Sequence, residues 1–195
     1  MLTLASRSPQ RRAILEQLGV EFRVEAPEAE ELTEGDPRAL VVENARSKAQ
    51  SVAGKRVLGA DTAVVLDRRV FGKPADRDAA EAFLRRLSGR GHDVYGGLCL
   101  CEGGEERTAH AITHVRFRPL EQQDVDWYLE SGEWRERAGA YAIQGKGAAL
   151  VAGIGGDYFN VVGLPVGALV ELAPGLVRAA AASPGTAPAG GYPSP

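Results

Sequence analysis

An acid and a lysine lie close together in the stretch Leu58 to Pro74, LGADTAVVLDRRVFGKP. A short apolar run leads to Asp61, and a hairpin-like segment then leads to Gly72-Lys73-Pro74, so one supersecondary unit presents an anion and a cation. Such a pair suits activation of a water molecule beside a phosphate. The same residues also fit a strand end and an ordinary turn, so the rest of the chain must decide between the two interpretations.

The surroundings of Asp61 favour a functional role. Apolar runs flank it on both sides, Val57 to Ala60 and Ala63 to Leu66, so the carboxylate lies inside a strand-like region and must find a partner. A metal ion, a lysine or a bound water would each serve. Asp67-Arg68-Arg69 is the predicted hairpin turn, followed by a short return strand.

A second candidate anion site follows the first predicted strand, Leu2 to Ala5. Ser8 is a good N-cap and Pro9 suits the first helical position, which predicts a helix to about Leu18. The free N–H groups at a helix N-terminus attract anions. Serine and arginine side chains add donors there, namely Ser6, Arg7, Ser8, Arg11 and Arg12. A capped helix with solvated arginines explains the segment equally well.

An acidic segment, Glu28 to Glu31, follows a second predicted strand, Glu21 to Val24. Acidic runs are usually solvated, but carboxylates are also the ligands that a magnesium ion takes when it bridges protein and phosphates. Asp36-Pro37 then begins a predicted helix that lasts to about Ala53.

That helix carries a lysine on its apolar face. Val41, Ala45 and Val52 form an inward stripe at helical spacing, and Lys48 falls on the same stripe. The lysine either extends along its methylenes to the surface or reaches into a cleft occupied by an anion.

The second half of the chain predicts scaffold elements and two glycine-rich segments. The scaffold comprises helices over 77–87, 121–131 and 166–173, with Trp127-Tyr128 near an edge, and two long strands between His92 and Phe117. The segment 138–147, AGAYAIQGKG, suits a backbone that approaches a ligand closely, and the amide of Gln144 matches a nucleobase edge. Both this segment and 153–160 could also be plain turns.

Composition limits the classes of function. The chain has 195 residues, 44% of them hydrophobic and 25% charged, which fits one globular domain over residues 1–178 or two small lobes. A net charge of -3 without a basic stripe argues against nucleic-acid binding, and no apolar run is long enough to cross a membrane. We expect the Ala/Pro/Gly-rich tail, residues 179–195, to be disordered.

The two cysteines, Cys99 and Cys101, would share one face of a strand and are poorly placed to bridge each other. We interpret them as small buried residues in a protein of the reducing cytoplasm. The N-terminus does not resemble a secretory signal. The three histidines lack zinc-binding spacing.

Eight motifs together resemble the Maf family of nucleoside triphosphate pyrophosphatases. In order they are SRSPQRRAILEQLG, EAEE, ENARSKA, GADT, FGKP, RRLSGRGH, AGAYAIQGKG and GGDYFNVVGLP, covering about residues 2 to 172. The resemblance implies an elongated α/β fold like that of the inosine triphosphate pyrophosphatases, with a mixed, twisted sheet, flanking helices and two lobes around a deep cleft. It also implies cleavage of nucleoside triphosphates to monophosphate and pyrophosphate with a divalent metal, Mg²⁺ or Mn²⁺. Related proteins make a homodimer a reasonable expectation.

The resemblance also assigns roles to residues. The family's general base falls on Asp61, its phosphate-binding positions on Ser8, Arg11, Lys48 and Lys73, and its acidic metal-linked position on Glu31. Asp61 would orient or deprotonate water, and a metal held partly by Glu31 and Asp61 would acidify it. The sequence does not separate the carboxylate that touches metal from the one that touches water.

Three positions bear on the choice of base. The branch resembling dTTP and UTP pyrophosphatases carries Arg after Ser-Pro, Thr after the catalytic Asp, and Gln in AxxIQG, whereas the branch acting on 7-methyl-GTP has Trp, Gln and Glu. This chain has Gln10, Thr62 and Gln144, so two positions follow the pyrimidine branch and Gln10 follows neither. We hypothesise a preference for pyrimidine or modified nucleotides. The competing hypothesis is a non-catalytic, nucleotide-sensing regulator of cell division.

Overall fold

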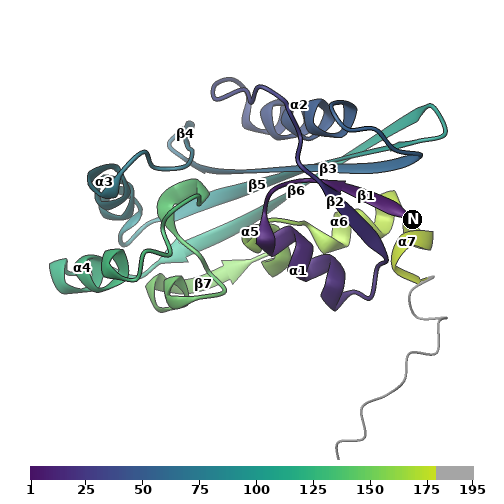
Figure 1. The fold of residues 1–195 in the computed structure, drawn as a ribbon. Helices are drawn as coiled ribbons and strands as arrows, with labels where there is room; N and C mark the ends of the chain where they lie inside the picture. The colour runs from purple at the N-terminus through teal and green to yellow at the C-terminus, as the bar shows by residue number, and fades with distance from the viewer. Residues whose placement is uncertain (179–195) are drawn as a thin grey trace, which may run out of the picture.

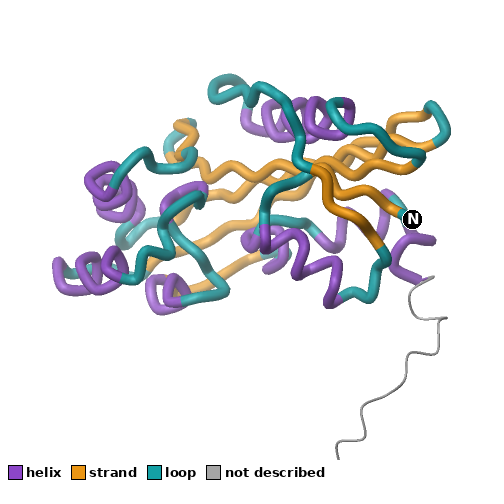
Figure 2. The backbone as a smooth tube through the Cα atoms, in the orientation of Figure 1, coloured by secondary structure: helices purple, strands orange, loops and turns teal. Residues whose placement is uncertain are grey.

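The computed structural model describes residues 1–178, so the tail expected over 179–195 lies outside the described residues. The described part is an α/β fold with a mixed seven-stranded sheet in the order β2-β1-β3-β5-β6-β7, and β4 pairs with β3. Figures 1 and 2 show an elongated molecule with helices on both faces of the sheet. The strands are β1 Leu2–Ala5, β2 Phe22–Glu25, β3 Arg56–Leu66, β4 Arg69–Phe71, β5 Gly91–Glu102, β6 Glu105–Phe117 and β7 Val151–Gly155.

The predicted caps begin the three longer N-terminal helices. Ser8, Asp36 and Asp76 each accept a hydrogen bond from the backbone N–H three residues later, which satisfies a donor that the helix itself cannot pair. The helices are α1 Pro9–Gln17, α2 Pro37–Gln50, α3 Arg77–Leu87, α4 Gln122–Glu130, α5 Tyr158–Val162, α6 Val166–Leu172 and α7 Pro174–Arg178, with 3₁₀ turns η1 Ala138–Ala140 and η2 Lys146–Leu150. Among the described helices, none is long and apolar enough to cross a membrane.

Strand β3 runs through the middle of the sheet and is paired unevenly on its two sides. On one side β5 pairs with it from Arg56 to Val65. On the other side β1 runs parallel to residues 57–59, and β4 runs antiparallel to residues 64–66. Residues 60–63 therefore have no strand partner on that side within the described ladders, and Asp61 lies in this gap.

Two hydrophobic clusters lie on either side of the gap. The first half of β3 contributes Leu58 and Ala60 to a cluster with β1, α1 and α6. The second half contributes Val64 and Leu66 to a cluster with α3, α4 and the segment around Tyr141. Because one strand crosses both clusters, the polar residues at its centre lie where neither cluster covers them. This arrangement matches the two lobes expected from the resemblance.

Helix α2 packs unusually closely on the sheet because glycines face it. A Cβ on Gly59 of β3 would lie 2.0 Å from the Ala45 carbonyl oxygen, and a Cβ on Gly97 of β5 would lie 2.2 Å from that of Val41. These distances are far below a van der Waals contact, so the backbones can approach only where side chains are missing.

The glycine-rich segments serve the fold more than the sequence indicated. Residues 151–155 form the edge strand β7 on β6, where no strand was predicted, and the short helix α5 follows. In the segment 138–147, a Cβ on Gly139 would lie 2.9 Å from Val64. The missing side chain therefore lets this segment pack against β3, and its purpose is not to bring the backbone close to a ligand. Tyr128, expected near an edge, is buried, and its hydroxyl accepts a hydrogen bond from the Ala142 N–H.

A buried histidine joins the segment around Tyr141 to β5. His92 Nε2 lies 2.9 Å from the Tyr141 hydroxyl, and its ring packs edge-on against Phe117 and Tyr141. Burial, helped by the charge of His114, lowers the pKa of His92 from 6.5 to about 4. The imidazole is therefore neutral in the folded protein at neutral pH.

We predict that Gly59→Ala destabilises the protein by about 3 kcal/mol, because α2 must move away from β3 to admit the methyl group. Urea denaturation measures the change. Gly155→Ala is the matched control, since a Cβ at Gly155 on the edge strand meets no atom within 4 Å. Equal stability of the two variants would contradict the close-packing argument.

We predict that His92 makes the protein less stable in mild acid. The unfolded chain binds a proton at His92 near pH 6.5 and the folded chain only near pH 4, so protonation favours unfolding between these values. Its contribution amounts to roughly 2 kcal/mol lost between pH 7 and pH 5. Urea denaturation at both pH values should show a smaller loss for His92→Gln, whose amide can still pair with Tyr141. The exposed-site control His110→Gln should keep the wild-type loss.

Candidate active site

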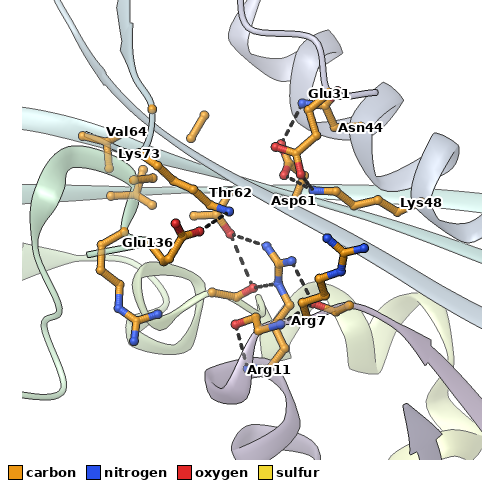
Figure 3. A pocket seen from close by; sticks show the side chains of 18 of the residues that line it. Arg7, Arg11, Glu31, Asn44, Lys48, Asp61, Thr62, Val64, Lys73 and Glu136 are labelled. Carbon is orange, nitrogen blue, oxygen red and sulfur yellow. Dashed lines mark hydrogen bonds and ion pairs between the residues drawn. The ribbon is translucent and has the colours of Figure 1, made fainter. Parts of the chain in front are cut away.

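A cavity of about 870 Å³ opens beside the gap in β3. Its walls come from the turn between β1 and α1, the segment before α2, the face of α2, the centre of β3, the β4 end and residues 136–144 (Figure 3). The polar lining side chains include Ser6, Arg7, Ser8, Arg11, Glu31, Thr33, Asn44, Lys48, Asp61, Thr62, Lys73, Glu136, Arg137, Tyr141 and Gln144. Of the predicted site residues, all but Gln10 line this cavity.

An ion pair forms the floor of the cavity. Lys48 Nζ lies 2.6 Å from Asp61 Oδ1 and 2.8 Å from Glu31 Oε1, so the lysine on the apolar stripe of α2 meets two carboxylates. Asp61 is 7% exposed and Lys48 is 6% exposed. Partial burial acts to raise the pKa of Glu31, but its hydrogen bond to Lys48 and the charges of Lys48, Lys73 and Arg11 hold it below its ordinary value.

Asn44 is a site residue that the sequence analysis missed. Its side chain is 2% exposed, and Asn44 Nδ2 donates to Asp61 Oδ2 at 3.0 Å. It lies one helical turn before Lys48, so the two side chains reach the same carboxylate from one face of α2. That i, i+4 spacing was the signal that could have found it.

Arg11 is held from three sides. Its Nε donates to the Gly163 carbonyl at 2.8 Å, Nη1 to Ser6 Oγ at 3.2 Å and Nη2 to Thr62 Oγ1 at 3.2 Å. Burial lowers the pKa of Arg11, opposed by the charges of Asp61 and Glu31, and a guanidinium nevertheless keeps its proton in proteins. Arg11 is thus a fixed positive charge in the wall, and Thr62 is engaged with it.

The α1 N-terminus links to the far wall through Gln10. Ser8 Oγ caps α1 by accepting from the Arg11 N–H and donates to Gln10 Oε1 at 3.2 Å. Gln10 Oε1 also accepts a hydrogen bond from Arg137 Nη1. Gln10 therefore does not line the cavity but contacts Arg137, which does.

The remaining predicted residues lie at the outer part of the cavity. Lys73 Nζ pairs with Glu136 Oε2 at 3.0 Å, and both side chains are more than half exposed. Gln144, three residues after the buried Tyr141, also lines the cavity and is exposed. Figure 3 shows Lys73 and Glu136 on the opposite side of Thr62 from Glu31 and Asn44.

The donor set on the cavity floor fits a hard divalent cation. Glu31 and Asp61 both line the cavity. Both carboxylates pair with Lys48 Nζ, so the two acids lie near each other. Oxygen ligands of this kind, completed by water and phosphate oxygens, are those that Mg²⁺ prefers. In the described part of the chain, the one group of three closely spaced His, Cys, Asp or Glu side chains is Cys99, Cys101 and Glu106, on the sheet away from the cavity, where the thiols are free.

Comparison with known proteins shows the family to which the chain belongs. Residues 1–175 match the family model described as Maf-like protein. The dTTP/UTP pyrophosphatase of Symbiobacterium thermophilum is 50% identical over 177 residues, covering 88% of this chain and 91% of its own, and that of Myxococcus xanthus is 48% identical, covering 88% and 90%. The solved Ham1 protein of Staphylococcus aureus aligns over 60% of this chain and 71% of its own at 14% identity with a TM-score of 0.44. The chain belongs to the Maf family.

Proposed function

We propose that this protein hydrolyses dTTP and UTP between the α- and β-phosphates, releasing a nucleoside monophosphate and pyrophosphate. Relatives that it matches over about nine tenths of their length carry the name dTTP/UTP pyrophosphatase. The observation that carries the proposal is the buried Asp61 carboxylate, held by Lys48 and Asn44 at the floor of a cavity that has cations in its walls.

Asp61 is the group that activates water. Lys48 occupies one position on Oδ1 and Asn44 one on Oδ2, and a carboxylate has about four lone-pair sites. The remaining sites can accept a proton from a water molecule in the cavity. The carboxylate cannot rotate away because both oxygens are held, so it acts from a fixed position.

Fixed positive charges stabilise the charge that builds up on phosphate oxygens. Arg11 is immobilised by its three hydrogen bonds, Lys48 lies on the floor, and Lys73 and Arg7 lie nearer the opening. Groups already in place when charge develops stabilise a transition state without reorganisation. Lys73 can exchange Glu136 for a phosphate because this exposed ion pair is weak.

We propose Mg²⁺ or Mn²⁺ as the cofactor, with Glu31 and Asp61 as the protein ligands. When bound, such an ion neutralises phosphate charge and acidifies a coordinated water. Glu31 would then exchange its contact with Lys48 for the metal, and the lysine would remain on Asp61. The homodimer stays a prediction.

We predict that Asp61→Asn lowers kcat for dTTP by at least about 100-fold, because the amide cannot accept the proton of the attacking water. Pyrophosphate release from a panel of nucleoside triphosphates with Mg²⁺ or Mn²⁺ measures it. Asp67→Asn, an acid exposed at the end of the same strand, is the matched control and should keep wild-type activity. Wild-type protein that binds dTTP but releases no more pyrophosphate than Asp61→Asn would favour the nucleotide-sensing regulator.

We propose that the base is recognised at the outer part of the cavity by Gln144 and Arg137. Uracil and thymine offer two carbonyl oxygens flanking an N–H, which an amide and a guanidinium can pair with. Arg137 lines the cavity while Gln10 holds its guanidinium. Gln10 thus acts on the base through Arg137, whereas Thr62 contacts Arg11, the guanidinium assigned above to the phosphates.

We predict that Arg137→Ala raises KM for dTTP and UTP about 10-fold, because a charge-assisted hydrogen bond worth about 1.4 kcal/mol is lost. Steady-state kinetics should show a much smaller change in kcat. The control is Arg135→Ala, two residues away, whose guanidinium stacks over Trp134 at 4.7 Å. An equal change in KM for both variants would contradict the role of Arg137.

A further inference from the structure

The segment between β2 and α2, residues 26–35, carries Glu31 and has little regular structure. Among the hydrogen bonds and ion pairs of the described residues, two anchors tie it to the rest of the protein. Glu31 pairs with Lys48, and the backbone of Leu32 pairs with Asn44. Most of its side chains are exposed, so few apolar contacts hold it in place.

The side-chain amide of Asn44 forms hydrogen bonds with both backbone groups of Leu32. Its Oδ1 accepts from the Leu32 N–H at 2.7 Å, and its Nδ2 donates to the Leu32 carbonyl oxygen at 3.0 Å. The same Nδ2 donates its second hydrogen to Asp61 Oδ2 at 3.0 Å. One buried amide therefore joins the segment to the carboxylate, and three of its four hydrogen-bonding positions are used.

We propose that Asn44 is a positioning residue that seats the Glu31 segment and orients Asp61 at the same time. Seating Leu32 fixes the backbone next to Glu31 and so fixes how far the Glu31 carboxylate can lie from Asp61. The amide hydrogen on Oδ2 fixes the plane of the Asp61 carboxylate. Loss of either bond from Asn44 weakens the other, because both share one side-chain rotamer.

Only an amide meets all of these demands. An aspartate at position 44 could not donate to the Leu32 carbonyl or to Asp61, and would add a negative charge beside Asp61 and Glu31. A leucine would leave the backbone groups of Leu32 without protein partners. The neighbouring cations Lys48, Arg11 and Lys73 cannot replace the lost acceptor for the Leu32 N–H.

The kinetic test rests on the proposed pyrophosphatase activity. Asn44→Ala should lower kcat for dTTP by roughly 10- to 100-fold, the usual effect of losing a group that orients a catalytic side chain. KM for dTTP should change less than threefold, because the phosphate-binding cations stay in place. The control Gln50→Ala removes an amide from the exposed face of the same helix, where it contacts Glu106, and should behave as wild type.

The structural test does not depend on activity. A protease that cuts after glutamate has targets at Glu28, Glu30, Glu31 and Glu34, and mass spectrometry identifies cuts within the segment. Asn44→Ala should be cut there at least about 10-fold faster than wild type at equal overall stability. Leu32→Pro should be cut equally fast at Glu28, Glu30 and Glu34, because proline has no N–H for Asn44; the bond between Glu31 and the introduced proline resists the protease and is not compared. Leu32→Ala keeps the backbone bonds and should be cut at the wild-type rate.

The two tests separate the proposals. If wild-type protein releases no pyrophosphate, the proposed function fails while faster cutting of Asn44→Ala and Leu32→Pro still supports the seating of the segment. Cutting of both variants at the wild-type rate would overturn the seating. An active wild type with unchanged kcat in a folded Asn44→Ala would overturn the orientation of Asp61.

Discussion

The site depends on keeping one carboxylate charged inside the protein. Asp61 lies on a central strand between two hydrophobic clusters and is almost fully covered. A buried charge is strongly unfavourable unless it is paired and hydrogen-bonded. Lys48 supplies the opposite charge and Asn44 supplies a hydrogen bond, and the two residues come from α2. The side chain of Asn44 is short, so the helix must lie very close to the strand, which explains the glycines at positions 59 and 97. Packing and chemistry are therefore coupled through the distance between α2 and the sheet.

The cavity itself is a consequence of strand pairing. Strand β1 ends beside Gly59, and the last residue of β4, Phe71, lies beside Val64, so the centre of β3 has no partner among the described strands on this side. The chain leaving β1 turns into α1 at this point and brings Ser6, Ser8 and Arg11 to the opening. Ligands of α/β sheets commonly bind beyond the carboxyl end of a parallel strand, and the end of β1 provides such a place here.

The walls of the cavity are tied together by hydrogen bonds between distant segments. Arg11 connects α1, β3 and the turn before α6 through Thr62 and Gly163. The hydrogen bond between Gln10 and Arg137 connects α1 to residues 136–144, which form the opposite wall. Such bonds hold cations and donors in place before substrate arrives, which is the condition for electrostatic stabilisation of a transition state. By contrast, two anchors hold the Glu31 segment among the hydrogen bonds and ion pairs of the described residues, so it is the part of the site whose position depends most on single side chains.

The local sequence determined most of the elements and the types of residue at the site. Caps predicted the starts of α1, α2 and α3, helical spacing placed Lys48 inward, and the apolar runs around Asp61 predicted a buried acid, because these signals depend on residues a few positions apart. Tertiary structure alone decided the partners. Asn44 meets Leu32 and Asp61, 12 and 17 positions away, and Gln10 meets Arg137 across 127 positions. The edge strand β7 and the burial of Tyr128 were likewise missed, since glycine-rich sequence lacks strand periodicity and a single tyrosine does not reveal which segment its hydroxyl will hold. Local patterns report the preferences of a chain for its own backbone, whereas the site consists of contacts that form only when the sheet brings distant segments together.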